Sequence, residues 1–73
     1  MISQTSAYAL EAAVILAQQP EERMRANQLS DTLAIPANYL SKILNAMARA
    51  GLLDSVRGPR GGFRLARSAG GAR

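Results

Sequence analysis

Hydrophobic residues dominate the first quarter of the chain and predict a helix with little polar surface. Thr5 or Ser6 can cap its start, and it is expected to end near Gln18, shortly before Pro20. Polar positions form only a narrow line that includes Glu11. Because apolar side chains surround most of its circumference, this helix needs cover on several sides, which a small domain does not readily supply.

Two further helices are expected, joined by a tight turn. Apolar residues at helical spacing mark a short helix that ends near Leu33. Its start is poorly marked, because Arg25 is an unfavourable capping residue. Pro36 suits the first turn of a new helix, and Gly51 suits the position just after a helix ends. The third helix is therefore predicted over Pro36–Ala50.

This third helix has two distinct faces. Its apolar side chains gather within an arc of about 100°, and they are Leu40, Ile43, Leu44 and Met47. The opposite face carries side chains that can bond base edges or phosphates, and they are Asn38, Ser41, Lys42, Asn45 and Arg49. An ordinary surface helix can also show such a face, so the pattern alone leaves both interpretations open.

The last ordered segment predicts a β-hairpin. The segment 52–57 has apolar Leu53 and Val56, and over 63–66 the apolar residues Phe63 and Leu65 alternate with others. Between the two segments, 58–62 consists of turn-forming residues. The predicted domain spans residues 1–67, and 68–73 are expected to form a flexible tail. The fold class is mainly α with a small β-hairpin: a winged helix-turn-helix of three helices and a two-stranded wing.

The charge is concentrated in the second part of the chain. The whole sequence has nine Lys and Arg against five Asp and Glu, which gives +4. Residues 1–40 hold two Arg and four acidic residues, a net of −2, whereas 41–73 hold seven basic residues and one acidic residue, a net of +6. A basic end on a small domain indicates a polyanionic ligand, although a merely solvated basic surface is the alternative.

Several classes of function are disfavoured by composition. The chain has no cysteine and no histidine, so it lacks the thiolate and imidazole groups on which many metal sites and catalytic centres depend. We therefore expect neither an enzyme nor a bound cofactor or metal. The most apolar stretch, Ala7–Ala17, is too short for a bilayer and contains Glu11. A cytoplasmic location without membrane contact is expected.

The order of helix, helix and basic ribbon favours binding to double-stranded DNA. In a winged helix-turn-helix, the second helix of the pair enters the major groove. Arg57 and Arg60 lie among glycines at the ribbon tip, which can approach the backbone or the minor groove. Tyr39 either bonds a phosphate or flanks the core, and Tyr8 and Phe63 are expected in the core.

Three segments resemble a known family. They are YALEAAVILA at Tyr8–Ala17, IPANYLSKIL at Ile35–Leu44 and ARAGLLDSVRGPRGGFRLAR at Ala48–Arg67. This sequence is similar to the Rrf-type bacterial transcription regulators, the group that includes IscR, NsrR and CymR. The resemblance implies a dimeric repressor or activator that reads a pseudo-palindromic operator.

The resemblance also implies roles for particular residues. It places Asn38, Tyr39, Ser41 and Lys42 at the DNA-facing start of the reading helix, and Arg57 in the minor groove. Some members have Glu where this chain has Ser41, which changes the base preference. Others have glycine at the position of Arg60, which here adds a phosphate contact.

The relatives are longer than this chain, which implies a different assembly. Their second half supplies a dimerisation helix and, in sensing members, the cysteines of an iron–sulfur cluster. No cluster can be carried over, and dimerisation of this chain is expected to be weak or absent. The apolar first helix would be covered in relatives by the dimerisation helix and the partner subunit. We expect a DNA-binding domain, either excised or naturally short.

The predicted site has three parts. The residues expected to read bases are Asn38, Ser41, Lys42 and Asn45. The residues expected to hold phosphates are Tyr39, Arg49, Arg60 and Arg64. Arg57 is expected to enter the minor groove. A protein-interaction module that kept the fold, or an RNA-binding domain, remains an alternative.

Overall fold

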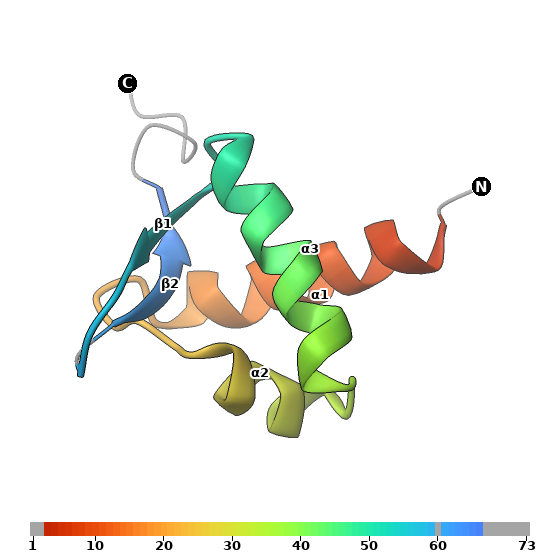
Figure 1. Cartoon of the computed structure of the whole chain (residues 1–73). Coiled ribbons are helices and arrows are strands. Elements are labelled where there is room, and N and C mark those ends of the chain that lie inside the picture. The colour runs from red at the N-terminus through yellow and green to blue at the C-terminus, as the bar shows by residue number, and fades with distance from the viewer. Residues whose placement is uncertain (1–2, 60, 67–73) are drawn as a thin grey trace.

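The computed structural model describes residues 3–59 and 61–66, and within them three helices precede a β-hairpin (Figure 1). The helices are α1 (Gln4–Gln18), α2 (Ala26–Leu33) and α3 (Ala37–Arg49), and the strands are β1 (Leu53–Val56) and β2 (Gly62–Leu65). This order confirms the predicted winged helix-turn-helix. The predicted tail at 68–73 lies outside the described residues.

Helix α1 begins earlier than the sequence analysis predicted. Its cap is Ser3, whose Oγ accepts the backbone N–H of Ser6 at 3.1 Å. Thr5 and Ser6 lie inside the helix, so the prediction that one of them caps it was wrong. Several hydroxyl residues follow one another here, and local preference alone does not select among them. The end at Gln18 is as predicted.

The turn between α2 and α3 is tight. Ala34 adopts the left-handed conformation with φ of 59°, which costs roughly 1–2 kcal/mol for a residue other than glycine. The Ser30 hydroxyl donates a hydrogen bond to the carbonyl of Ile35 and so closes the turn. Pro36 then precedes α3, and Gly51 follows its end with φ of 85°. This geometry fixes the angle at which α3 leaves α2.

The hydrophobic core lies where α1, α2, α3 and the hairpin meet. The predicted apolar face of α3 is buried in full, as Leu40, Ile43, Leu44 and Met47. Leu16 and Leu29 bring α1 and α2 to the same cluster, and Tyr8 and Phe63 pack against it as expected. Figure 1 shows α3 crossing in front of α1. Burial of one side of α3 leaves its polar side facing outward.

The hairpin is extended by Met24, which lies between α1 and α2. In the antiparallel register, Leu53 faces Leu65 and Ser55 faces Phe63. On the other edge of β2, the N–H of Met24 donates to the Phe63 carbonyl at 2.9 Å. The N–H of Phe63 donates back to the Met24 carbonyl at 2.7 Å. Backbone pairing of this kind leaves no clear signature in side-chain pattern, which is why it was missed.

One side of α1 stays uncovered. Leu10 and Val14 are each 56% exposed. Together with Glu11, Ile15 and Leu33 they line a shallow groove of about 290 Å³. The expectation that this domain cannot cover α1 by itself is therefore confirmed. None of the described helices combines the length and hydrophobicity needed to cross a membrane.

Candidate nucleic-acid interface

The polar face of α3 is an outward stripe along the helix. Asn38, Lys42, Asn45 and Arg49 are exposed, and Ser41 is half-buried. These positions follow one another by three or four residues, so they share the side opposite the buried one. The stripe begins in the first turn of α3 and ends in the last. Amide, hydroxyl, ammonium and guanidinium groups are therefore available to a ligand along nearly the full length of α3.

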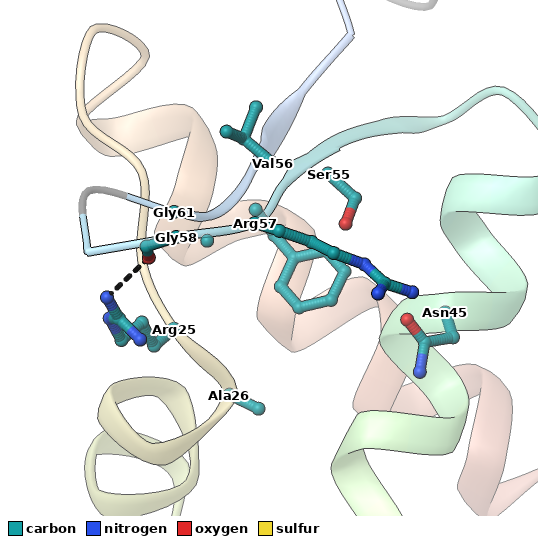
Figure 2. Close-up of a pocket in the computed structure, with 10 residues that line it drawn as sticks. Arg25, Ala26, Asn45, Ser55, Val56, Arg57, Gly58 and Gly61 are labelled. Carbon is teal, nitrogen blue, oxygen red and sulfur yellow. Dashed lines mark hydrogen bonds between the residues drawn. The ribbon is translucent and has the colours of Figure 1, made fainter.

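The wing directs Arg57 toward this stripe. Leu53 is buried against the core, and Ser55 and Arg57 follow at every second position. Figure 2 shows the exposed Arg57 side chain extended from the wing toward Asn45 of α3. The wing and α3 enclose a concave surface with a volume of about 330 Å³. The residues that line it include Arg25, Asn45, Ser55 and Arg57. A cation of the wing and an amide of α3 therefore face the same space.

Arg64 belongs to the other side of the hairpin. Its neighbours Phe63 and Leu65 pack against the core, so strand alternation turns Arg64 away from it. Arg64 also lies directly across from Asp54 in the register. The structure thus does not bring Arg64 together with Arg57. The predicted phosphate contact of Arg60 lies outside the described residues.

Tyr39 links α3 to the start of α1. Its hydroxyl shares a hydrogen bond with Thr5 Oγ1 at 3.0 Å. Its ring meets that of Tyr8 edge to face, with centroids 5.8 Å apart. Tyr39 is 37% exposed, so it flanks the core while its hydroxyl remains near the surface. A phenolic oxygen can donate and accept at once, so this bond leaves capacity for a further partner.

Arg25, the residue just before α2, contacts the wing, and the sequence analysis did not include it in the site. Its Nη2 donates to the carbonyl of Gly58 at 2.8 Å and to that of Pro59 at 2.6 Å. Figure 2 shows the bond to Gly58. One signal was visible in the sequence: an arginine stands where a capping serine, threonine or aspartate is usual. The contact itself joins segments more than 30 residues apart, which local patterns do not reveal.

Two glycines are required by the close approach of backbone at the wing. A Cβ on Gly61 would lie 2.2 Å from the carbonyl oxygen of Val56. A Cβ on Gly62, whose φ is 140°, would lie 2.8 Å from the carbonyl oxygen of Met24. No side chain fits at either place without moving the backbone. The glycine run is therefore a structural requirement of the tight wing.

Nearly the whole sequence matches one known protein family. The model of the Rrf2 family, described as iron-dependent transcriptional regulators, matches residues 2–71. The chain belongs to the Rrf2 family. Among curated relatives, this Rrf2-family chain is similar to a Rhodopseudomonas palustris protein named as the putative HTH-type transcriptional regulator BadM. The two are 44% identical over 57 residues, which cover 78% of this chain and 36% of BadM.

Two solved structures share the fold of this chain. T. potens IscR matches with a TM-score of 0.81 and 31% identity, over 92% of this chain and 50% of that one. CymR, the global cysteine regulator of B. subtilis, matches with a TM-score of 0.76 and 26% identity, over 89% of this chain and 51% of that one. The Rrf2-family chain thus spans about half the length of these solved relatives.

The iron dependence in the family's description finds no matching ligands within this sequence. Its 73 residues contain no cysteine and no histidine, the side chains that hold iron–sulfur clusters. Among the residues that the structure describes, no three acidic side chains gather into a possible metal site. The residues of this chain that the structure describes therefore do not fit an iron centre.

Proposed function

We propose that this chain is the sequence-specific, double-stranded DNA-binding domain of a bacterial transcriptional regulator. Helix α3 enters the major groove, and the wing reaches the adjacent minor groove. The observation that carries the proposal is that Asn45 of α3 and Arg57 of the wing line the same concave surface. The polar face of α3 and the positive charge of the wing therefore lie on one side of the molecule. Family membership supports the same conclusion.

Bases are read from the outward stripe of α3. Asn38 and Asn45 each carry an amide that can pair with an adenine edge through two hydrogen bonds. Lys42 donates to guanine acceptors, and Ser41 either donates or accepts. Each good bidentate contact contributes roughly 1–3 kcal/mol of discrimination.

Phosphates are held around this stripe. Tyr39 in the first turn of α3 and Arg49 in its last turn contact phosphates at the two ends of the helix. Arg57 enters the minor groove, where a narrow A·T-rich groove concentrates negative potential. Arg60 and Arg64 contact phosphates beside the wing. The position of Arg64 on the outer side of the hairpin gives it a flanking role, with Asp54 reducing the local charge.

The full regulator acts as a homodimer on a pseudo-palindromic operator in the cytoplasm, and this domain acts as a binder without catalysis. Support for a partner comes from the exposed Leu10 and Val14 on α1, which form an apolar strip next to Leu33. Two domains related by a twofold axis would read two half-sites. By itself the domain binds one half-site weakly, or pairs only on DNA.

The exposed side chains of α3 argue against a protein-interaction role for this helix. The outward residues Asn38, Lys42, Asn45 and Arg49 are polar or cationic, whereas a helix that docks on a protein usually exposes apolar anchors. The apolar strip of this domain lies on α1 instead.

A competition titration tests the proposal. The chain is titrated into a fluorescent DNA duplex at low salt, and unlabelled duplex DNA and duplex RNA of the same sequence compete. DNA should displace the probe at lower concentration than RNA, because the deep, narrow major groove of an RNA duplex does not admit a helix. Equal competition, or no binding, would contradict the proposal.

A further inference from the structure

The wing is attached to the rest of the domain at two levels. Along the outer edge of β2, Met24 and Phe63 exchange two backbone hydrogen bonds. At its tip, Arg25 Nη2 bonds the carbonyls of Gly58 and Pro59. Met24 and Arg25 are neighbours, so one short segment before α2 holds both β2 and the tip of the wing.

The backbone of Arg25 is itself fixed. Its N–H donates to Oε1 of Gln28 at 2.9 Å, and its carbonyl accepts the N–H of Leu29 at 3.1 Å. Gln28 thus accepts the N–H of the residue just before α2, and the Arg25 guanidinium, which carries donors only, does not cap the helix. It bonds the tip of the wing at the edge of the concave surface instead (Figure 2).

The carbonyl of Gly58 is the point where two constraints on the turn converge. It accepts the N–H of Gly61 at 2.9 Å across the turn and Arg25 Nη2 at 2.8 Å. A carbonyl oxygen has two lone pairs, so both bonds can form together. Gly58 has φ of 107°, and a Cβ on it would meet no other atom within 4 Å. Because glycine has few steric limits on its backbone, the turn can change conformation here unless it is held.

We infer that Arg25 is a positioning residue for the wing, which orders the turn beside Arg57 before DNA is bound. This inference rests on the proposed function, in which Arg57 enters the minor groove. Arg57 directly precedes Gly58, so a mobile turn would spread Arg57 over many positions. Ordering it in advance removes an entropic cost that binding would otherwise bear. Both acceptors are neutral carbonyls, so the guanidinium also keeps its positive charge.

The test is a double-mutant cycle of Arg25→Met with Arg57→Ala, in the whole chain with a DNA duplex selected by it. Arg25→Met removes the donors but leaves the backbone cap with Gln28. Alone, it should weaken binding about fivefold to tenfold, the scale of ordering one flexible segment. In the Arg57→Ala background its effect should fall within about twofold, the usual error of additivity. In a Lys42→Ala background, the matched control on α3, the full effect should remain.

A direct phosphate contact by Arg25 would give a different result. Its removal would then add fully to Arg57→Ala and would lower the salt slope of that variant by about 0.9. Either that result, or unchanged affinity for Arg25→Met alone, would overturn the inference.

A second measurement uses the free chain. Amide hydrogen exchange by NMR should become faster at Gly61 in Arg25→Met, because its acceptor Gly58 is no longer held. Exchange at Leu29 and Phe63 should stay unchanged and so report an intact α2 and an intact pairing of β2 with Met24. Unchanged exchange at Gly61 would overturn the inference. Failure of the unmodified chain to bind DNA would count against the proposed function alone, because this measurement needs no DNA.

Discussion

Arg57 is the residue whose removal separates binding from folding most clearly. It is exposed, and it projects toward α3 without contributing to the core. Arg57→Ala should therefore change the free energy of unfolding by no more than about 0.5 kcal/mol. It should weaken binding to a specific duplex by about 1–3 kcal/mol. Thermal melts and fluorescence anisotropy at matched salt measure the two quantities.

Arg57→Lys provides the control for charge alone. Lysine keeps the positive charge but lacks the planar, weakly hydrated guanidinium that suits a narrow groove. It should bind between the unmodified chain and Arg57→Ala. Unchanged affinity of Arg57→Ala would remove this residue from the interface.

Exposure of individual residues on α3 could be predicted from sequence, whereas contacts across the fold could not. Helical periodicity alone separates Leu44 from Asn45, and the structure buries the first and exposes the second. The bond of Arg25 to the wing depends on how segments more than 30 residues apart meet. The site residues themselves remain predictions until DNA binding is measured.

At the scale of the elements, the wing depends on Gly61. The structure leaves no room for a Cβ there, since it would lie 2.2 Å from the Val56 carbonyl oxygen. Gly61→Ala should destabilise the domain by about 1–3 kcal/mol, the range for overpacked sites. It should also weaken DNA binding, because the turn must open and displace Arg57. Circular dichroism melts and anisotropy titrations test both effects.

Gly51→Ala is the matched control for a loss of stability without a change in the wing. Gly51 has φ of 85°, but a Cβ at this position would meet no other atom within 4 Å. The left-handed conformation costs alanine roughly 1–2 kcal/mol, so this variant should melt earlier yet bind DNA normally below its melting range. If Gly61→Ala bound DNA like Gly51→Ala, the wing would have no part in binding.

The elements could be predicted largely from periodicity and from turn residues. Pro36 and Gly51 mark the limits of α3, and the glycine run marks the wing. The start of α1 at Ser3 was missed because adjacent hydroxyl residues compete as caps. The strand-like pairing of Met24 was missed because it uses only backbone atoms.

At the scale of the whole molecule, the positive charge predicts a strong dependence on salt. Residues 41–73 include most of α3 and the whole wing, and they carry a net charge of +6. The logarithm of the DNA association constant should fall linearly with the logarithm of salt concentration. Arg49→Ala should reduce the magnitude of that slope by about 0.9, the value for one lost phosphate contact. Titrations across a series of salt concentrations measure it, and a flat response would contradict the electrostatic account.

The most direct test of specific readout is selection of bound duplexes from a random DNA pool by the unmodified chain and by Asn45→Ala. The account predicts that the unmodified chain enriches a recurrent half-site, since α3 presents a fixed set of base-contacting groups. Asn45→Ala should enrich the same half-site with relaxed preference at one position. A pool that shows no enriched sequence after selection by the unmodified chain would contradict specific readout by α3.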